Sequence, residues 1–441
     1  MAHPPPVPQY TRRQVLPAGV ALAAALGAPA LRAATSATPA TATTARTATT
    51  LTVAAFPAVD KIVEAALPAW RALHPDVAVK VVSRQFIDHH TAMTAALSTN
   101  THLPDLMALE VGYVGRFARG AGLDDLNSTP YRFDQIADRF ARYAVQQARR
   151  RDGGVVAVPS DIGPGTLLYR TDLLAQAGLA EADLTTSWAG YVKAGLRLKA
   201  ATGAYLVAHA RDVKDILIRT GLQPGQGLYF DQASRVLVNT PRFQRAFELA
   251  REVRQHKLDA RVSAWSNDWS ESFKRGRLAT QMTGAWLAGH LANWLAPDTR
   301  GKWRAAHLPE GAWAAYGGAF LSIPRGATAA HKPWAWELIR FLTLSPERQL
   351  AAFKSQDAFP ALLSTYDDAF FDQPLPFLGG QPARRLWREA VRNISAVEVH
   401  KQDAFAGEVI DSALDQVLDA GKPVAQALAD AERLLARRAH R

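Results

Sequence analysis

Two tryptophans, an amide and a carboxylate are concentrated in residues 265–269, which read WSNDW. An indole stacks on the apolar C–H face of a sugar ring, while amides and carboxylates hydrogen-bond the hydroxyl groups at its rim. We therefore expect Trp265 to lie at a sugar-binding cleft, with Asn267 or Asp268 behind it. Because aromatic side chains are more often structural, a second interpretation places one of the two tryptophans, Trp269 above all, in the core.

Two acids, Glu110 and Asp161, each follow a short buried-strand pattern at a point where the chain reverses. A carboxylate in such a place can accept two hydroxyl hydrogen bonds, and charge-assisted hydrogen bonds are the strong ones. We expect both acids to contact the ligand, with Asp161 solvated until the ligand binds. The alternative is that either residue is an ordinary solvated loop acid.

Signatures of catalysis and of metal binding are poor. The sequence has no Gly-x-Ser-x-Gly, no phosphate-binding GxxxxGK[ST] loop and no Gly-x-Gly-x-x-Gly after a strand. It has no cysteine, which excludes disulfides, thiolate metal sites and a cysteine nucleophile. His89 and His90 are adjacent and His209 stands apart, so none has the spacing of a metal site. We expect no catalytic residue, no metal and no cofactor.

The elements that position these residues begin with alternating strand and helix patterns. Apolar strand candidates occupy residues 51–56, 77–82 and 106–109, and helical spacing of apolar side chains occupies residues 59–73 and 89–97. This alternation predicts a parallel sheet with right-handed crossovers, whose ligands collect at the carboxyl ends of the strands. The loops at those ends contain Phe56, Phe86, Glu110 and Tyr113.

A change of direction follows in residues 153–172. Residues 155–158 form a short β-branched run that Pro159 ends, and a Gly-Pro-Gly elbow comes next. An extended apolar stretch then leads to a helix that begins at Thr171. This order indicates a chain that leaves one compact unit and enters another, with Asp161 at the elbow.

Five segments occur in a fixed order along the chain. They are PDLMALEVGYVGRFARGAGLDDL, the elbow with LLYRTDLL and AGL, SFKRGRLATQMTGAW, YGGAFLSIP, and KPWAWELIRFLTLSPERQ. In this order they resemble the extracellular solute-binding proteins of ABC sugar importers, the maltose-binding-protein-like superfamily.

The resemblance implies an α/β, two-lobed periplasmic binding protein fold of type II, with a ligand cleft between lobes joined by three crossovers. Lobe 1 would comprise residues 51–158 and 308–358, and lobe 2 residues 159–307 and 359–441. It also implies that Trp286 and the segment Tyr316-Gly317-Gly318 line the cleft, because glycine lets backbone N–H groups approach a ligand closely. A tight turn without a ligand role is the alternative for the two glycines. The full set of expected ligand-binding residues is Phe56, Phe86, Glu110, Tyr113, Asp161, Trp265, Asn267, Trp286, Tyr316, Gly317 and Gly318.

The implied function is the capture of a sugar, oligosaccharide or polyol and its delivery to the transmembrane permease subunits of an ABC transporter. We expect a monomer that closes its lobes on the ligand and performs no covalent chemistry. Two alternatives remain open. One is a secreted glycoside hydrolase, because aromatic residues and paired acids also describe a catalytic cleft. The other is a binding protein for a different solute, such as a polyamine, a phosphate ester or a metal chelate.

The N-terminal residues have a composition of their own. Residues 1–33 carry Arg12-Arg13 and then an Ala-rich apolar run, which predicts a twin-arginine (Tat) export signal. A plain secretory signal or a membrane anchor is the alternative. Residues 34–50 form a Thr/Ala tract that we expect to be a disordered linker. An exported chain without a lipid-modified cysteine needs an outer membrane to retain it, so the expected location is a Gram-negative periplasm.

Length and charge limit the remaining possibilities. At 441 residues the chain is too long for one ordinary core, which agrees with two lobes. The formal net charge is +11, from 51 Lys and Arg against 40 Asp and Glu. Acids and bases are interleaved, as in residues 245–252, and this indicates solvated helix faces rather than a basic stripe for nucleic acid. We therefore expect no nucleic-acid partner.

Overall fold

The computed structural model describes residues 49–439 except 119, 151 and 224. Contacts divide the chain into Met1–Arg46 and Thr47–Arg441, and the described residues all belong to the second unit. The predicted export signal, residues 1–33, and all but the last two residues of the predicted linker therefore lie outside the described residues.

The strands of the second unit form one mixed sheet in the order β2-β1-β3-β7-β4-β5, with β6 and β8 also paired to β4. β1 pairs in parallel with β2 and β3, as the strand–helix alternation predicted. β1 begins at Thr49, so the last two residues of the predicted linker belong to the sheet. The strands are β1 Thr49–Ala55, β2 Val77–Ser83, β3 Leu106–Glu110, β4 Val158–Arg170, β5 Thr280–Gly284, β6 Trp303–Ala306, β7 Ala315–Ser322 and β8 Phe359–Pro360.

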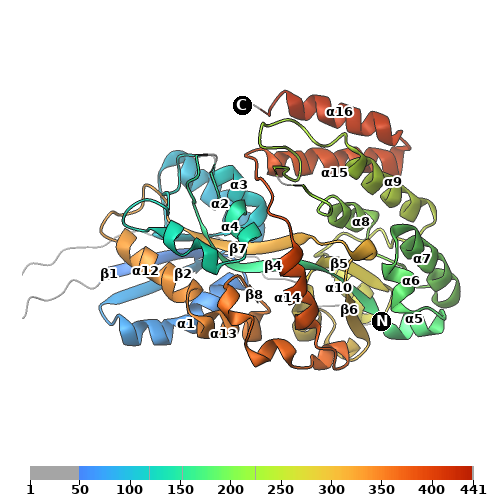
Figure 1. Cartoon of the computed structure of the whole chain (residues 1–441), viewed down its shortest axis with the longest axis horizontal. Coiled ribbons are helices and arrows are strands. Elements are labelled where there is room, and N and C mark those ends of the chain that lie inside the picture. The colour runs from blue at the N-terminus through green and yellow to red at the C-terminus, as the bar shows by residue number, and fades with distance from the viewer. Residues whose placement is uncertain (1–48, 119, 151, 224, 440–441) are drawn as a thin grey trace, which may run out of the picture. The chain divides into compact units, whose positions relative to one another are not determined.

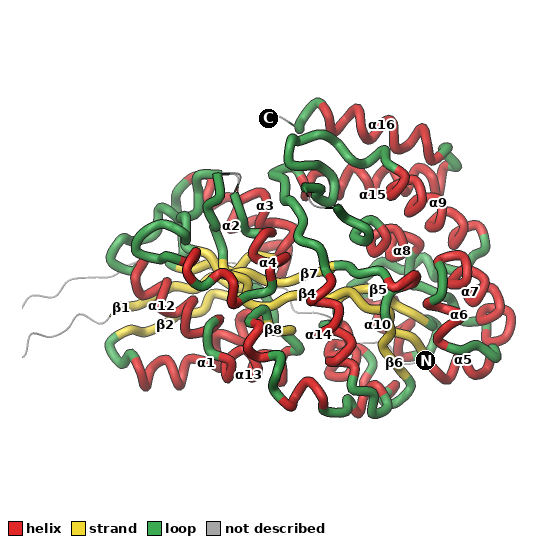
Figure 2. Tube along the Cα trace, in the orientation of Figure 1, coloured by secondary structure: helices red, strands yellow, loops and turns green. Residues whose placement is uncertain are grey.

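Helices lie on both sides of the sheet, with α2 and α3 above it and α1 and α13 below it in the view of Figure 2. The helix predicted over residues 59–73 is α1, which buries the apolar face that ends at Trp70. The Trp70 indole N–H donates to the Val77 carbonyl (2.9 Å), so this face is fixed to β2. The α-helices are α1 Val59–Leu73, α2 Phe86–Thr99, α3 Val111–Ala118, α4 Arg142–Gln147, α5 Thr171–Gln176, α6 Glu181–Thr185, α7 Trp188–Thr202, α8 Ala210–Leu217, α9 Pro241–Gln255, α10 Asn267–Lys274, α11 Leu287–His290, α12 Lys332–Thr343, α13 Pro346–Gln356, α14 Ala383–Asn393, α15 Asp403–Ala420 and α16 Val424–Ala436.

β4 is one continuous strand through the predicted elbow, and together with β7 it runs through the middle of this unit (Figure 1). The expectation of a strand over residues 155–158 that Pro159 ends is therefore wrong, because β4 begins only at Val158 and continues through Pro159. The strand continues because its pairing with β7 shifts register on each side of Asp161, between Pro159 and Asp161 and between Ile162 and Pro164. Such irregularities accommodate residues that cannot donate to a regular ladder.

Two clusters of buried apolar side chains lie on the two parts of the sheet. The first contains Leu51, Trp70 and Leu109 together with Phe359 and Trp387. The second contains apolar side chains of β4, α7, α8, α9, α15 and α16. The first cluster therefore includes side chains from residues 359–441, which the sequence assigned to lobe 2. A shared cluster does not define a lobe, so the predicted lobe limits stay a prediction.

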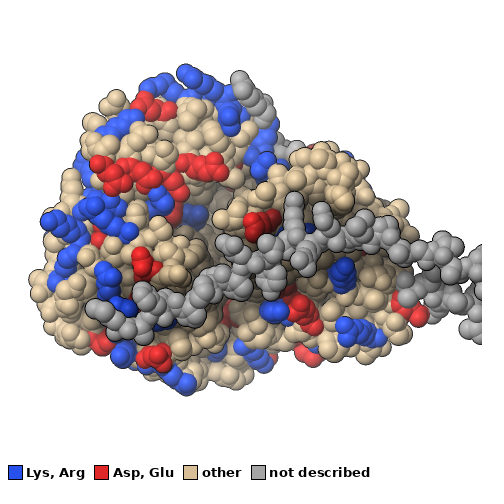
Figure 3. Space-filling view, turned by 180° about the vertical axis from the view of Figure 1, so that it is seen from behind, with Lys and Arg blue, Asp and Glu red and all other residues tan. Residues whose placement is uncertain are grey.

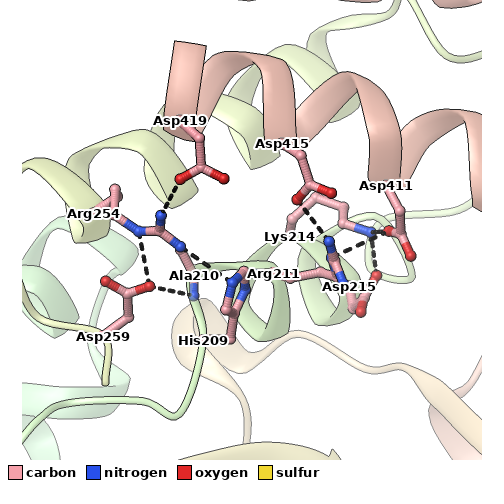
Figure 4. Close-up of polar contacts among 10 residues, drawn as sticks. All are labelled: His209, Ala210, Arg211, Lys214, Asp215, Arg254, Asp259, Asp411, Asp415 and Asp419. Atoms are coloured by element: carbon pink, nitrogen blue, oxygen red, sulfur yellow. Dashed lines mark hydrogen bonds and ion pairs between the residues drawn. The ribbon is translucent and has the colours of Figure 1, made fainter. Parts of the chain in front are cut away.

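An ionic network attaches α15, the last helix but one, to α8 and α9 (Figure 4). Asp411, Asp415 and Asp419 follow one another at four-residue spacing and so share one face of α15. Lys214 of α8 is fully buried and donates to Asp411 (2.6 Å) and to its neighbour Asp215. Further along the face, Arg211 pairs with Asp415 (2.6 Å), and Arg254 of α9 pairs with Asp419 (2.6 Å) and with Asp259 (2.9 Å).

The exposed surface carries both signs of charge. Basic and acidic side chains are intermixed over the face drawn in Figure 3, as the interleaving in the sequence predicted. Among the described residues, no helix has the length and apolar character needed to cross a membrane.

The buried ammonium of Lys214 gives a stability prediction. Replacing both Asp215 and Asp411 by Asn should lower the free energy of unfolding by about 3–5 kcal/mol, because it leaves a buried charge without its partners. Adding Lys214→Met to this double variant should recover most of the loss, since the uncompensated charge is then gone. Urea denaturation measures both effects.

The exposed pair Lys61–Glu64 (2.9 Å) provides the control for this experiment. Removing it should change the free energy of unfolding by less than about 1 kcal/mol. A double variant at Asp215 and Asp411 that is as stable as the parent would show that Lys214 does not depend on these acids.

Candidate ligand-binding cleft

A cavity of about 1580 Å³ opens along the middle of the sheet. The first residues of α1, α2 and α3, which follow the carboxyl ends of β1, β2 and β3, lie on one side of it. The segments around Trp265 and Trp286 lie on the other, and Asp161 with residues 316–319 lies between. All of the site residues expected from the sequence line this cavity except Tyr113 and Asn267. Their roles in binding stay a prediction.

Two tryptophans form an apolar wall of the cavity. Trp265 and Trp286 lie nearly parallel, with ring centroids 5.7 Å apart and planes inclined by 19°. Trp265 is 58% exposed, so most of its ring is available to a ligand. Its backbone has φ +68°, a left-handed conformation that is costly for a bulky residue and is often found at functional sites. The Trp286 indole N–H donates to the Tyr316 carbonyl (3.0 Å), which fixes the orientation of that ring.

The local fold explains why the other residues of the WSNDW segment do not share this role. Ser266 caps α10 by accepting a hydrogen bond from the Trp269 backbone N–H (3.2 Å). Trp269 then falls on the buried side of the helix, where it is 2% exposed as the core interpretation held, and it borders the cavity with little of its surface. Asn267 is exposed and does not line the cavity.

On the side of the cavity opposite the tryptophans, His90 contacts several of the expected site residues. Its Nδ1 lies 2.8 Å from the Phe86 carbonyl, and its Nε2 accepts the backbone N–H of Glu110 (3.0 Å). One nitrogen therefore donates and the other accepts, which requires a neutral ring. The same ring stacks on Tyr113 at 4.0 Å and contacts Phe56 at 5.2 Å. Tyr113 thus packs on His90, and neither of these two rings lines the cavity.

The Glu110 side chain, at the end of β3, hydrogen-bonds to the beginning of the helix that follows it, α3. Its Oε2 accepts the backbone N–H of Gly112 (2.7 Å) at the beginning of α3, where the helix dipole favours a negative charge. Burial nevertheless dominates and raises the pKa of Glu110 from 4.5 to about 7, with a smaller opposing effect from Arg219. A ligand that donates hydrogen bonds to this carboxyl would therefore replace the water that burial has removed.

Asp161 connects the two central strands. Its Oδ1 accepts the backbone N–H of Ala319 (3.1 Å), and burial raises its pKa to about 6. It is half-buried in this structure, and the expectation that it is solvated until the ligand binds stays a prediction. The neighbouring backbones come very close, since a Cβ on Gly163 would lie 1.9 Å from the Tyr316 carbonyl oxygen. Gly317 and Gly318 have φ of +85° and +133°, so β7 passes this point in a conformation that favours glycine.

Several polar residues of the cavity escaped the sequence analysis, and Arg219, Asp212 and Gln281 are three of them. The Arg219 guanidinium lies 4.5 Å from the centre of the Tyr316 ring and donates to the Asp215 carbonyl (2.6 Å). Burial raises the pKa of Asp212 to about 7, and the side chain of Gln281 hydrogen-bonds to it. The Gln281 amide oxygen is buried and has no partner among the described residues. These residues follow no recognisable motif.

His89 and His209 have structural roles in this arrangement. His89 Nε2 lies 2.8 Å from the Ala108 carbonyl, and His209 Nδ1 accepts the backbone N–H of Arg211 (3.0 Å). Within residues 49–439, apart from the three undescribed positions, no group of three or more His, Asp or Glu side chains is placed to hold a metal ion.

Comparison with known proteins identifies a family. Residues 65–375 match the family model of bacterial extracellular solute-binding proteins. A lactose-binding protein of Rhizobium radiobacter is 28% identical over 357 residues, which cover 76% of this chain and 80% of that protein. An arabinooligosaccharide-binding protein of Halalkalibacterium halodurans is 22% identical over 331 residues, 72% of each chain.

Solved structures agree with this family. The crystal structure of an extracellular solute-binding protein of family 1 superimposes with a TM-score of 0.76 at 25% identity, covering 89% of this chain and 99% of the other. The predicted α/β, two-lobed periplasmic binding protein fold of type II is thereby confirmed.

The raised pKa of Glu110 predicts a pH-dependent stability. Because its folded pKa of about 7 lies above the ordinary 4.5, the folded state binds the proton more tightly, and stability falls as pH rises through this interval. Glu110→Gln mimics the protonated acid and removes this loss. It should leave stability unchanged at pH 4.5 and raise it by up to about 3 kcal/mol at pH 8, at about 1.4 kcal/mol per unit of pKa shift.

Thermal unfolding at intervals from pH 4.5 to pH 8 measures the difference between variant and parent. Asp161 and Arg219, which influence Glu110, are present in both proteins, and burial lowers the pKa of His90 to about 4, below this range. Glu64→Gln on the exposed side of α1 serves as control and should show no such trend. A constant offset for Glu110→Gln across the range would contradict the assigned burial.

Proposed function

This chain belongs to the family of bacterial extracellular solute-binding proteins, and we propose that its solute is a sugar, an oligosaccharide or a polyol. In this proposal the protein binds the solute outside the cytoplasm and delivers it to the permease of an ABC transporter. The lobes close on the solute, and no bond of the solute is broken.

The observation that carries the proposal is the parallel pair of Trp265 and Trp286 in one cavity with desolvated carboxyls. The indoles offer flat apolar faces to a sugar ring. Glu110 and Asp161 offer oxygens whose burial is unfavourable unless hydroxyl groups hydrogen-bond to them. The names of the two curated relatives, one for lactose and one for arabinooligosaccharides, support a sugar as the solute.

We further propose that export uses the Arg12-Arg13 signal of the twin-arginine pathway, that the protein resides in the periplasm, and that it acts as a monomer. A family of extracellular proteins requires export by some route, and the paired arginines with the Ala-rich run that follows them support this one.

A panel of carbon sources tests the function directly. A ligand that binds only the folded protein raises the midpoint of thermal unfolding, so at least one sugar or polyol should raise it, and no reducing ends should be released on incubation with glycans. Released reducing ends would instead establish a glycoside hydrolase. A response confined to polyamines or phosphate esters would establish a different solute class.

The tryptophan wall gives a second prediction for the sugar found in this way. Trp265→Ala should weaken binding by about 1–3 kcal/mol, by analogy with the stacking of bases on aromatic side chains. Because Trp265 is exposed, thermal stability should change little. Titration calorimetry measures the affinity.

Trp334→Ala is the matched control, since Trp334 packs against the first apolar cluster outside the cavity. It should lower stability and leave the affinity unchanged. Equal affinity of Trp265→Ala and the parent would exclude Trp265 from the binding wall.

A further inference from the structure

The tryptophan wall continues along one helical run beyond Trp286. Trp286, His290 and Trp294 follow at four-residue spacing, so their rings lie on one face of the run. The Trp286 and His290 ring centroids are 5.3 Å apart, and those of His290 and Trp294 are 5.5 Å apart. Through these two ring contacts the aromatic row extends from Trp286 to Trp294, beyond the Trp265–Trp286 pair.

Trp294 presents a free face at the end of this row. Its side chain is 54% exposed, and among the described residues its one ring contact is with His290. It belongs to the π-helical turn Leu291–Leu295, a rare conformation that is frequent at functional sites. An exposed indole at the rim of a polar cavity is more costly than one in the core, and a ligand would cover it.

A carboxylate from a distant segment meets this row. Asp357, at the end of α13, accepts a hydrogen bond from the Asn293 amide (3.2 Å), the one such bond it receives among the described residues. A Cβ on Gly289 would lie 1.6 Å from the Asp357 Oδ2, so this carboxylate reaches its place because residue 289 is glycine. His290 Nδ1, also at this corner, is buried with no partner in the described part of the chain.

From this arrangement we propose that Trp294, His290, Asn293 and Asp357 form a further subsite for a second sugar ring, so that the solute is an oligosaccharide. The proposal rests on the proposed sugar-binding function and narrows it, because a monosaccharide or polyol would leave this corner empty. The corner combines an aromatic face with a carboxylate, an amide and an unpaired imidazole nitrogen, the groups that hold a ring of hydroxyls.

The size of the cavity supports two or more rings. Pockets of about 300–1000 Å³ suffice for a drug-sized ligand. The cavity here measures about 1580 Å³, and Trp265 and Trp294 both line it. One ring over Trp265 and Trp286 would therefore leave the Trp294 corner free for the next ring of the same chain.

An array of mono-, di-, tri- and tetrasaccharides of glucan, galactan, arabinan and xylan type tests the proposal, followed by titration calorimetry of the glycans that bind. The parent should bind a disaccharide or longer glycan more tightly than the monosaccharide of the same series. Trp294→Ala should weaken the longer glycan about 5- to 100-fold and leave the monosaccharide unaffected. Asp357→Asn, which keeps the size of the side chain, should weaken the longer glycan in the same selective way.

Trp334→Ala, outside the cavity, should retain the preference for longer glycans, and unchanged thermal unfolding of Trp294→Ala checks its fold. If the parent binds a monosaccharide as tightly as any longer glycan, or if Trp294→Ala binds all glycans like the parent, the subsite is overturned and the proposed function stands. If Trp294→Ala weakens the monosaccharide equally, Trp294 belongs to the first ring's site and the subsite is likewise overturned. If no glycan binds the parent but a polyol or another sugar does, the subsite is overturned and the proposed function stands, whereas binding of neither sugars nor polyols overturns both.

Discussion

The antiparallel pairing of β4 with β7 is the constraint on which the rest of the structure depends. β4 pairs with β7 and β8 along its first part and with β5 and β6 along its second, so one strand supports both sides of the cavity. The pairing is tightest at Tyr316, whose carbonyl oxygen would collide with a Cβ on Gly163 or Gly284. That same carbonyl accepts the indole N–H of Trp286. The Tyr316 carbonyl therefore takes part both in the close approach of β4 to β7 and in the orientation of the Trp286 ring.

Desolvation gives the cavity its chemistry. Burial is the largest cause of the raised pKa of Glu110, Asp161, Asp212 and Asp357, all of which line it. A carboxyl that is removed from water and only partly hydrogen-bonded is stabilised by any donor that enters. Hydroxyl groups are such donors, and they bring no charge that would need its own partner. A neutral polyhydroxylated solute therefore suits these acids, while the indoles select for a ring with an apolar face.

The buried charges outside the cavity serve a different purpose. Lys214, Arg211 and Arg254 hold the acidic face of α15 against α8 and α9 (Figure 4). Of the three cations only Lys214 is fully buried, and a buried charge that loses a partner is strongly destabilising even where the intact pair contributes little net stability. Arg211 and Arg254 pair with acids of α15 that are 46% and 62% exposed. Asp212, which follows Arg211 in α8, lines the cavity, so α8 contacts both the ionic network and the cavity.

The sequence by itself determined the elements whose signals are local. The spacing of apolar side chains predicted α1 over its whole length and the parallel β2-β1-β3 arrangement, because periodicity and helix ends depend on neighbouring residues. Because these strands are parallel, their carboxyl ends lie at one edge of the sheet, and Phe56, Phe86 and Glu110 at those ends line the cavity.

Only the tertiary structure decided which residues complete the site. Asp161 meets Ala319 across 158 residues and Asp357 meets Asn293 across 64, separations over which no local pattern carries information. Likewise, the WSNDW segment could not show that Trp265 is exposed and Trp269 buried. That choice depends on the cap at Ser266 and on what α10 packs against. Burial, which sets both the pKa of the acids and the availability of the indoles, is a property of the assembled chain and not of any segment of it.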